Sequence, residues 1–386
     1  FNAEVKILFY FFEEAWFKPV DKLNDSEKIV VLRCAGFDLV MLKRFDAGLV
    51  AMETALKLAQ DTDDIDNATI TTRNLINVYI MNGNLTKAVK IAEENMPYAF
   101  KSTDTWMPIG FKCSLADALH RLGDFDGARK YFKEAEEYQK SDKFKKTEAE
   151  KRKYSYFYLY GLPGYQFCDF LLTIGDFEQV IKRSKTINKE SPDMKRPANI
   201  ALNELPLARA YLAQFISGDL DDSKIGFVSE QIEKAINSLK EAGRQDKLPI
   251  AFLTRAAFAR TVGGKETLEN AEADLRHALE LAVDSKAELQ KLEVLLEQIR
   301  VNMKLQEYEP DSSIISNIMR DTKEKIRIIK NMVSKTGYHI HDNEIEAIWR
   351  NAVQRGSGQR LHRGKQMLTP FGPLAIHQQL AKVPRP

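Results

Sequence analysis

A short phrase recurs along the chain and constrains its fold more than any other feature. It reads glycine, then Asp or Asn, then Phe or Leu, and each copy stands between two apolar runs. Glycine just past a helix end adopts the left-handed conformation at low cost, and Asp or Asn can cap the helix that follows. The copies are Asn82-Gly83-Asn84-Leu85, Leu122-Gly123-Asp124-Phe125, Ile174-Gly175-Asp176-Phe177 and Ser217-Gly218-Asp219-Leu220, with a degenerate copy at Lys43-Arg44-Phe45-Asp46. Each copy predicts the turn of a helix–turn–helix hairpin.

A residue soon after each turn is small in three copies out of four. Gly48, Ala88 and Ala128 occupy this position, and Val180 is the bulkier exception. Small side chains let two helices approach closely, so we expect the hairpin helices to meet there. The second helices of these hairpins are predicted at 47–59, 87–95, 127–139 and 178–187.

Further hairpins follow downstream, where apolar residues recur at helical spacing. The predicted helix pairs are 198–215 with 227–242, 249–262 with 266–283, and 286–304 with 312–334. No segment alternates with period two over a useful length, so we expect no strand. The sequence predicts an all-α fold, an α-solenoid of about seven helix–turn–helix hairpins.

Charge and composition divide the chain into three regions. Residues 1–24 are expected to form an N-terminal helix that ends an upstream region, and 25–354 form the solenoid. Residues 355–386 hold six basic residues, no acid and four prolines, and we expect a disordered tail. The chain has 57 basic and 55 acidic residues. Residues 1–354 hold 51 of the basic residues and all of the acidic ones, so their net charge is about −4. An acidic body argues against nucleic-acid binding, and the basic tail is the one feature that favours it.

The composition also bears on compartment. No run of about 18 apolar residues occurs, so no membrane-spanning helix is expected. Three cysteines, Cys34, Cys113 and Cys168, are too few and too widely spaced for a disulfide framework or a zinc site. The chain is therefore predicted to be cytoplasmic.

The hairpin pattern resembles the tetratricopeptide repeat (TPR). The resemblance covers roughly residues 25–305 and is carried by Leu122-Gly123-Asp124-Phe125, followed by Ala128 and Ala135, and by the corresponding sets nearby. It implies a right-handed superhelix whose first helices line a concave groove. Such a groove suits a protein or peptide ligand.

Three segments show a narrower resemblance, to the TPR sensor regions of bacterial STAND-type (NACHT or NB-ARC-like) signalling ATPases. They are Leu159-Tyr160-Gly161-Leu162-Pro163-Gly164-Tyr165-Gln166-Phe167-Cys168-Asp169, then Ala242-Gly243-Arg244-Gln245-Asp246-Lys247-Leu248-Pro249 with Arg255-Ala256-Ala257, and Thr336-Gly337-Tyr338-His339 with Asp342 and Glu344. In that family the array lies C-terminal to an NTPase domain and senses a ligand or partner. The resemblance implies an upstream NTPase domain, and a chain that begins at Phe1 suits a C-terminal fragment.

Candidate chemical motifs favour structural roles instead. Gly263-Gly264-Lys265 is followed by Glu266 rather than Ser or Thr, so a hairpin turn is expected, not a phosphate loop. The acidic run 61–66 lacks the calcium-loop spacing and is expected to cap a helix near Ala68. His339 and His341 are expected to close the last helix rather than bind a metal. We therefore predict no enzyme activity, no cofactor and no metal.

Polar side chains on the first helices are the candidate partner-binding residues. Alignment to the turns places eight of them on the groove face: Arg73, Asn77, Asp117, His120, Arg121, Asp169, Arg209 and Arg255. Tyr79 and Tyr211 fall at packing positions instead. The function predicted is a non-catalytic protein-interaction and ligand-sensing module, the sensor of a larger signalling or defence NTPase. The alternatives are a stand-alone TPR scaffold, an enzyme built on a helical solenoid, and a nucleic-acid binder.

Overall fold

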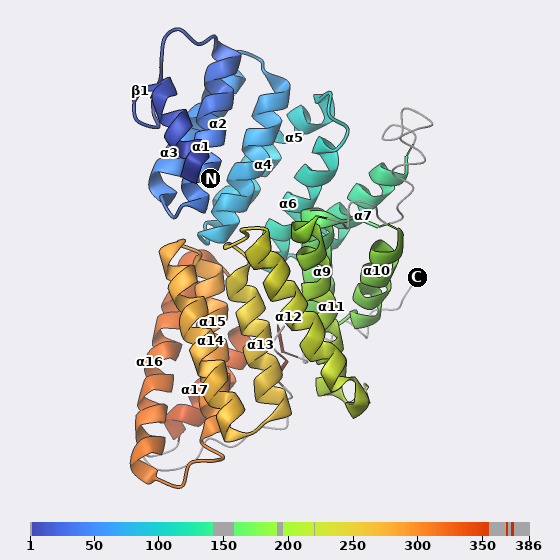
Figure 1. Ribbon diagram of the computed structural model, residues 1–386, viewed down its shortest axis with the longest axis vertical. Coiled ribbons are helices and arrows are strands. Elements are labelled where there is room, and N and C mark those ends of the chain that lie inside the picture. The colour runs from blue at the N-terminus through green and yellow to red at the C-terminus, as the bar shows by residue number, and fades with distance from the viewer. Residues whose placement is uncertain are drawn as a thin grey trace. The chain divides into compact units, whose positions relative to one another are not determined.

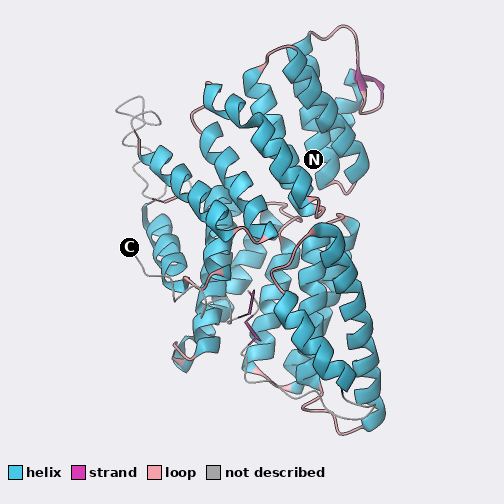
Figure 2. Cartoon of the chain, turned by 180° about the vertical axis from the view of Figure 1, so that it is seen from behind, coloured by secondary structure: helices cyan, strands magenta, loops and turns pink. Residues whose placement is uncertain are grey.

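The computed structural model describes residues 2–141, 158–190, 196–219, 221–354, 368–369 and 372–373, and helices dominate them (Figures 1 and 2). The chain divides into two compact units. Unit 1 is Phe1–Leu159 with Val283–Glu288, and unit 2 is Tyr160–Ala282 with Leu289–Pro386. The tail predicted at 355–386 lies outside the described residues, apart from the paired two-residue strands β3 (Leu368–Thr369) and β4 (Gly372–Pro373).

Unit 1 is a succession of hairpins in which each helix packs on the next (Figure 1). First helices also contact one another, α2 with α4 and α4 with α6. This is the packing of an α-solenoid, and it confirms the all-helical prediction at that level. The helices are α2 (Asp25–Met41), α3 (Phe45–Asp61), α4 (Ile65–Met81), α5 (Leu85–Lys101), α6 (Met107–Leu122) and α7 (Phe125–Lys140).

The turns adopt the backbone that the repeated phrase predicts. Gly83 and Gly123 have φ angles of 79° and 85°, in the left-handed region that glycine enters at low cost. Lys43 has a φ of 66° at the degenerate copy. The Asp124 side chain accepts a hydrogen bond from the Gly127 backbone N–H, as a helix cap should. The Asn84 side chain makes no capping hydrogen bond, so the cap prediction fails there.

The small position after the turn is where the helices meet, as expected. A Cβ atom on Gly48 would lie 2.6 Å from the Gly36 carbonyl oxygen, and one on Gly36 would lie 2.8 Å from the Gly48 carbonyl oxygen. The backbones of α2 and α3 therefore touch directly. Ala88, Ala128 and Val180 are fully buried at the same position in other hairpins.

The N-terminal segment departs from the predicted helix. Helix α1 spans only Asn2–Leu8, and a 3-10 turn (Phe9–Phe11) leads into strands β1 (Phe12–Glu14) and β2 (Lys18–Pro19). The strands pair antiparallel (Figure 2), so the expectation of no strand is wrong here. Trp16 in the connecting turn has a φ of 69° and is 6% exposed, and its ring contacts Phe9 and Phe12. Aromatic packing, not an alternating pattern, builds this hairpin.

Unit 2 continues with helical hairpins whose bounds match the predicted pairs within a few residues. Its elements are α9 (Gly161–Thr173), α10 (Phe177–Glu190), α11 (Pro197–Ser217), a 3-10 turn (Asp222–Lys224), α12 (Ile225–Glu241), α13 (Leu248–Val262), α14 (Lys265–Asp284), α15 (Glu288–Leu305), α16 (Ser312–Thr336) and α17 (Asp342–Gln354). Gly263 and Gly264 form the predicted turn with φ angles of 88° and 106°. Gly337 ends α16 in the left-handed conformation.

A buried network of charged side chains joins the last helices of unit 2. Arg300 donates to Glu344 at 2.7 and 2.8 Å and to Glu297 at 2.9 Å, and Arg260 donates to Glu297 at 2.6 Å. The side chains of Arg300, Glu297 and Glu344 are at most 1% exposed. Burial alone would lower the pKa of Arg300, but the charges of Glu344 and Glu297 raise it above its usual value. The network therefore holds α13, α15 and α17 together through fully paired charges.

His341 extends this network at the start of α17, a helix that lies beyond the predicted helix pairs. Its Nε2 lies 2.9 Å from Glu293 Oε1, and Tyr338 donates its hydroxyl to the same carboxylate. Burial would lower the pKa of His341, but Glu293 and Glu344 raise it to about 9. Burial would likewise raise the pKa of Glu293, but His341, Tyr338 and Arg300 hold it at about 2. At neutral pH the network thus pairs a charged imidazole with charged carboxylates.

None of the helices in the described part of the chain combines the length and the apolar character that a membrane crossing requires.

Candidate functional site

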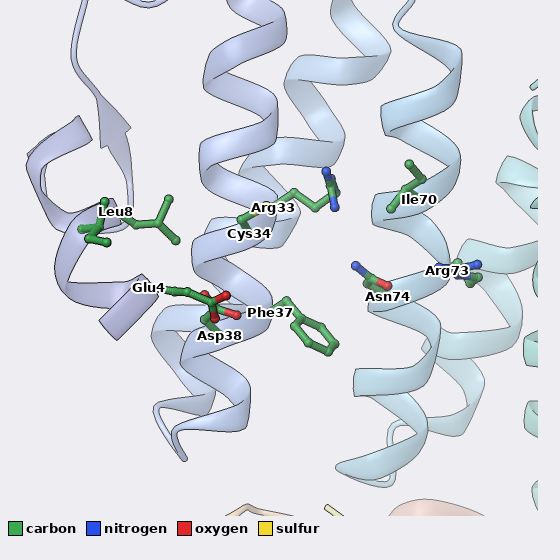
Figure 3. Close-up of a pocket in the computed structure, with 10 residues that line it drawn as sticks. Glu4, Leu8, Arg33, Cys34, Phe37, Asp38, Ile70, Arg73 and Asn74 are labelled. Carbon is green, nitrogen blue, oxygen red and sulfur yellow. The ribbon is translucent and has the colours of Figure 1, made fainter. Parts of the chain in front are cut away.

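A pocket of about 510 Å³ opens in unit 1 between α1, α2 and α4 (Figure 3). Helices α2 and α4 are the first helices of successive hairpins, and Arg73, one of the predicted groove residues, lines the pocket. It combines two arginines, two carboxylates and an apolar wall. Its lining residues are Glu4, Ile7, Leu8, Arg33, Cys34, Phe37, Asp38, Ile70, Arg73 and Asn74.

The two arginines occupy equivalent positions of neighbouring hairpins. Arg33 lies ten residues before Lys43, and Arg73 lies ten residues before Gly83, where Lys43 and Gly83 are the left-handed residues of their turns. Both residues line the pocket, but the Arg73 guanidinium lies on the far side of α4 from Arg33, toward α6 (Figure 3). Figure 3 shows Arg33 reaching from α2 toward α4, with Asn74 and Ile70 facing it from α4.

Neither guanidinium forms an ion pair within the described part of the chain. Among the described residues, no carboxylate forms an ion pair with Arg33 or Arg73, and the buried Nε of Arg33 has no hydrogen-bond acceptor. Burial lowers the pKa of Arg73, the charge of Asp104 opposes this shift, and Arg33 adds to it. An arginine without a counter-ion is costly to desolvate. Within the pocket, two carboxylates, Glu4 and Asp38, accompany the two arginines without forming an ion pair with them.

Gly110 of α6 makes room for Arg73 on the far side of α4. A Cβ atom on Gly110 would lie 3.0 Å from Arg73 Nη1, so a larger residue would push the guanidinium aside. Asn77, one turn along α4, donates to the Arg73 carbonyl oxygen and accepts from Ser114 of α6. These contacts position the Arg73 segment against α6.

Two carboxylates stand on the α1 side of the pocket. Asp38 of α2 is 7% exposed, and the carboxylate of Glu4 on α1 lies near it (Figure 3). Burial, and then the negative charge of Glu4, raises the pKa of Asp38 to about 6. This end of the pocket can take up a proton or a positive group near neutral pH. Ile7 and Leu8 of α1 and Ile70 of α4 add apolar surface to the lining (Figure 3).

Of the eight predicted binding residues, Arg73 is the only one in this pocket. Asp117 and Arg121 form an ion pair at 3.1 Å on α6, and Asn77 serves the α4–α6 packing described above. His120 was expected on an exposed groove face, and that expectation is wrong, because its side chain is fully buried. Its Nδ1 lies 3.9 Å from Asp117 Oδ1.

The three predicted residues of unit 2 are ion-paired within that unit. Arg209 of α11 contacts Asp169 of α9 at 2.5 Å, and both are buried. Arg255 of α13 bridges Glu233 of α12 and Asp274 of α14, at 2.8 and 2.7 Å. The hydrogen bond to Asp274 raises the pKa of Arg255 above its usual value. Arg255 also lines a second pocket, of about 450 Å³.

Sequence reasoning missed Arg33, Glu4 and Asp38. Arg33 was missed because the turn of its hairpin is the degenerate copy. Arg33 lies ten residues before Lys43, as Arg73 lies ten residues before Gly83, and this equal spacing would have aligned the two. No pattern could have placed Glu4, because α1 lies outside the repeats. The predicted packing residue Tyr79 is buried at 1% exposure, whereas Tyr211 is only partly buried.

The motifs set aside in the sequence have structural roles. Asp64 caps α4 through the Asn67 backbone N–H, and Asp66 accepts hydrogen bonds from Ser102 and Thr103. His339 contacts Asp342 at 2.7 Å at the start of α17. Comparison with known proteins adds no relative, because no family model and no curated protein matches the chain.

Proposed function

We propose that the chain is a non-catalytic protein-interaction and ligand-sensing module of the TPR kind. In this proposal about seven hairpins form a right-handed superhelix, and the first helices line the groove that binds a protein or peptide. The pocket between α2 and α4 carries the proposal, since it sits on successive first helices and displays polar groups beside an apolar wall. A pocket of this size with a few convergent polar groups is the usual setting for a ligand.

The resemblance to STAND-type sensors extends the proposal to the whole protein. A sensor array would lie C-terminal to an NTPase domain and control it through a bound ligand. A stand-alone scaffold is the alternative. The reading frame upstream of Phe1 separates the two, because a phosphate-loop NTPase domain in frame supports the sensor and its absence from the natural protein contradicts it.

Peptide selection tests the binding function directly. A random peptide library displayed on phage is panned against the full chain and, in parallel, against Asn74→Trp. Asn74 is half-buried in the pocket wall, so a tryptophan there fills the space that a ligand side chain would enter. The matched control, Lys101→Trp, changes an exposed residue of α5.

We expect peptides that bind the wild-type chain and Lys101→Trp but not Asn74→Trp. No enrichment on any of the three proteins would refute the binding function. Enrichment unaffected by Asn74→Trp would place the ligand on another surface. Asp117 and Arg209 are poor choices for such a test, because both are buried in ion pairs and their loss disturbs the fold.

A further inference from the structure

We propose that the pocket of about 450 Å³ in unit 2 binds a basic side chain of a partner peptide, together with an apolar residue next to it in that peptide. The pocket is lined by α12, α13 and α14, which all belong to unit 2. Two of these, α12 and α14, are second helices of their hairpins. The site therefore goes beyond the proposed function, whose groove is lined by first helices.

Arg255 holds two carboxylates in place at this pocket. Its Nε and Nη2 donate to Asp274 at 2.7 Å each, and its Nη1 donates to both oxygens of Glu233, at 2.8 and 3.0 Å. Each of the four carboxylate oxygens thus accepts one hydrogen bond from Arg255 and keeps a second lone pair. These three residues are the charged groups of the lining. One guanidinium set against two carboxylates leaves an excess of one negative charge, which a second cation would neutralise.

The exposed charges beside the pocket have the same sign. Glu230 of α12 and Glu266 and Glu269 of α14 are each next to a lining residue in the sequence, and all three are exposed. None of them forms an ion pair with a residue that the structure describes. Lys234 and Lys265, the lysines closest to lining residues in the sequence, each contact a glutamate outside the pocket. Negative charge around a pocket attracts a cationic ligand and repels an anionic one.

An apolar stripe on α13 continues the pocket beyond Arg255. Phe258, Ala259 and Val262 follow Arg255 by three, four and seven residues, so they lie on the same face of the helix. Phe258 is half-buried, and Val262 is 44% exposed. A hydrated metal ion would leave this stripe in water, whereas a peptide with an apolar residue beside its basic one would cover it. The stem of the basic side chain adds further apolar contact.

The first experiment uses a defined peptide. The full chain is labelled with ¹³C at its alanine methyl groups, and the signals of Ala259 and Ala273 in the pocket are assigned by Ala259→Ser and Ala273→Ser. N-acetyl-Leu-Arg-Leu-amide is titrated at constant ionic strength, in parallel with the form that carries citrulline, the neutral isostere of arginine. We expect both signals to shift and saturate with the arginine peptide, while Ala47 of unit 1 serves as the reference. The citrulline peptide should bind about tenfold more weakly or worse, because it lacks the charge-assisted contact.

Matched substitutions then place the peptide in the pocket. Glu233→Gln removes the excess negative charge at a side chain that is 47% exposed, and it should weaken the arginine peptide about tenfold. Its control is Glu241→Gln, the same change at the exposed last residue of α12. Val262→Ser should weaken binding by a smaller factor through lost apolar contact. Its control is Val50→Ser on α3, at a side chain of similar exposure, 46%.

Several outcomes would overturn the site. Equal binding of the citrulline and arginine peptides would remove the cation, and arginine-peptide binding that Glu233→Gln leaves unchanged would place the ligand elsewhere. Shifts that stay linear, or that Ala47 shares, would show that no specific site exists. Calcium chloride is the competing probe, and saturating shifts with calcium but not with the peptide would assign a metal instead. The peptide selection with Asn74→Trp tests a pocket in unit 1, so either proposal can fail while the other stands.

Discussion

Arginine has opposite surroundings in the two units. In unit 2, Arg300 is buried and contacts both Glu297 and Glu344. In unit 1, Arg33 and Arg73 line a pocket and form no ion pair with any residue that the structure describes. A buried cation that is fully paired belongs to the fold, because removing one partner leaves an uncompensated charge. A half-buried cation without an ion-pair partner gives up part of its hydration and gains no ion pair in return, so it lowers stability.

Removal of the ion-paired Arg300 in unit 2 should cause the largest loss of stability. Arg300→Met leaves the carboxylates of Glu297 and Glu344 buried without their main partner. We expect a loss of about 3 to 5 kcal/mol in the free energy of unfolding of the α15–α17 region. Amide hydrogen exchange of α15 and α17 measures it. Arg320→Met, on the exposed face of α16, is the control, and equal exchange in both variants would contradict a stabilising network.

The pH dependence of unit 2 gives the next largest effect. The pKa of His341 is raised to about 9. Its stabilising contribution is therefore complete below pH 6.5 and is lost as the pH rises through 9. The pKa values of Glu293 and Glu344 are lowered to about 2, so their contribution is present above 4.5 and is lost only toward pH 2.

The free energy of unfolding of unit 2 should accordingly fall by about 2 kcal/mol between pH 6.5 and 9. Urea titrations followed by circular dichroism at several pH values measure this change. His341→Gln should remove most of this slope. A slope that persists in His341→Gln would assign the effect to another group.

Unit 1 depends on backbone contact where unit 2 uses charge. Gly48→Val places a branched side chain where even a Cβ atom would lie 2.6 Å from the Gly36 carbonyl oxygen. We expect a loss of about 2 kcal/mol, measured as a shift in the urea midpoint of unit 1. Gly226→Ala, in α12 with open space around it, should instead be neutral or slightly stabilising. A neutral Gly48→Val would show that α2 and α3 separate easily.

These variants also mark what the sequence could predict. The turn glycines and the small residues after them depend on local backbone geometry, so Gly83, Gly123 and Gly48 were interpretable from the chain alone. Ion pairs depend on which helix packs beside which. Arg255 of α13 contacts Glu233 of α12 and Asp274 of α14. His341 contacts Glu293 of α15.

The residues next to an arginine in the sequence do not show whether it forms an ion pair. The sequence therefore predicted both Arg73 and Arg209 as partner-binding residues. The structure separates them by their partners. Trp16 shows a second limit, because a residue other than glycine has a positive φ there, in a turn where its ring contacts Phe9 and Phe12.

The acidic end of the unit 1 pocket loses stability with rising pH, as the His341 network does, but in a lower pH window. Burial and Glu4 raise the pKa of Asp38 to about 6, so its carboxylate lowers stability above that pH. Protonation relieves this loss as the pH falls through 6, and the relief is complete below 3.8. Asp38→Asn should stabilise unit 1 by about 1 to 2 kcal/mol at pH 7.5, allowing for solvent screening in an open pocket.

That gain should shrink toward pH 4, where wild-type Asp38 is protonated as well. Urea midpoints at the two pH values measure the change. Asp61→Asn, at the exposed end of α3, is the control and should show little dependence on pH. A gain that stays constant with pH would point to hydrogen bonding of the amide rather than to relief of charge.

The smallest expected effect is a change in stability that has opposite signs for an unpaired and a paired arginine. Arg33→Met removes a cation that has no protein partner and keeps the apolar stem, so we expect unit 1 to gain up to about 1 kcal/mol. Arg300→Met, the same substitution, should cause a large loss. A loss of stability in Arg33→Met would mean that Arg33 already supports the fold, and the contrast between the two units would then disappear.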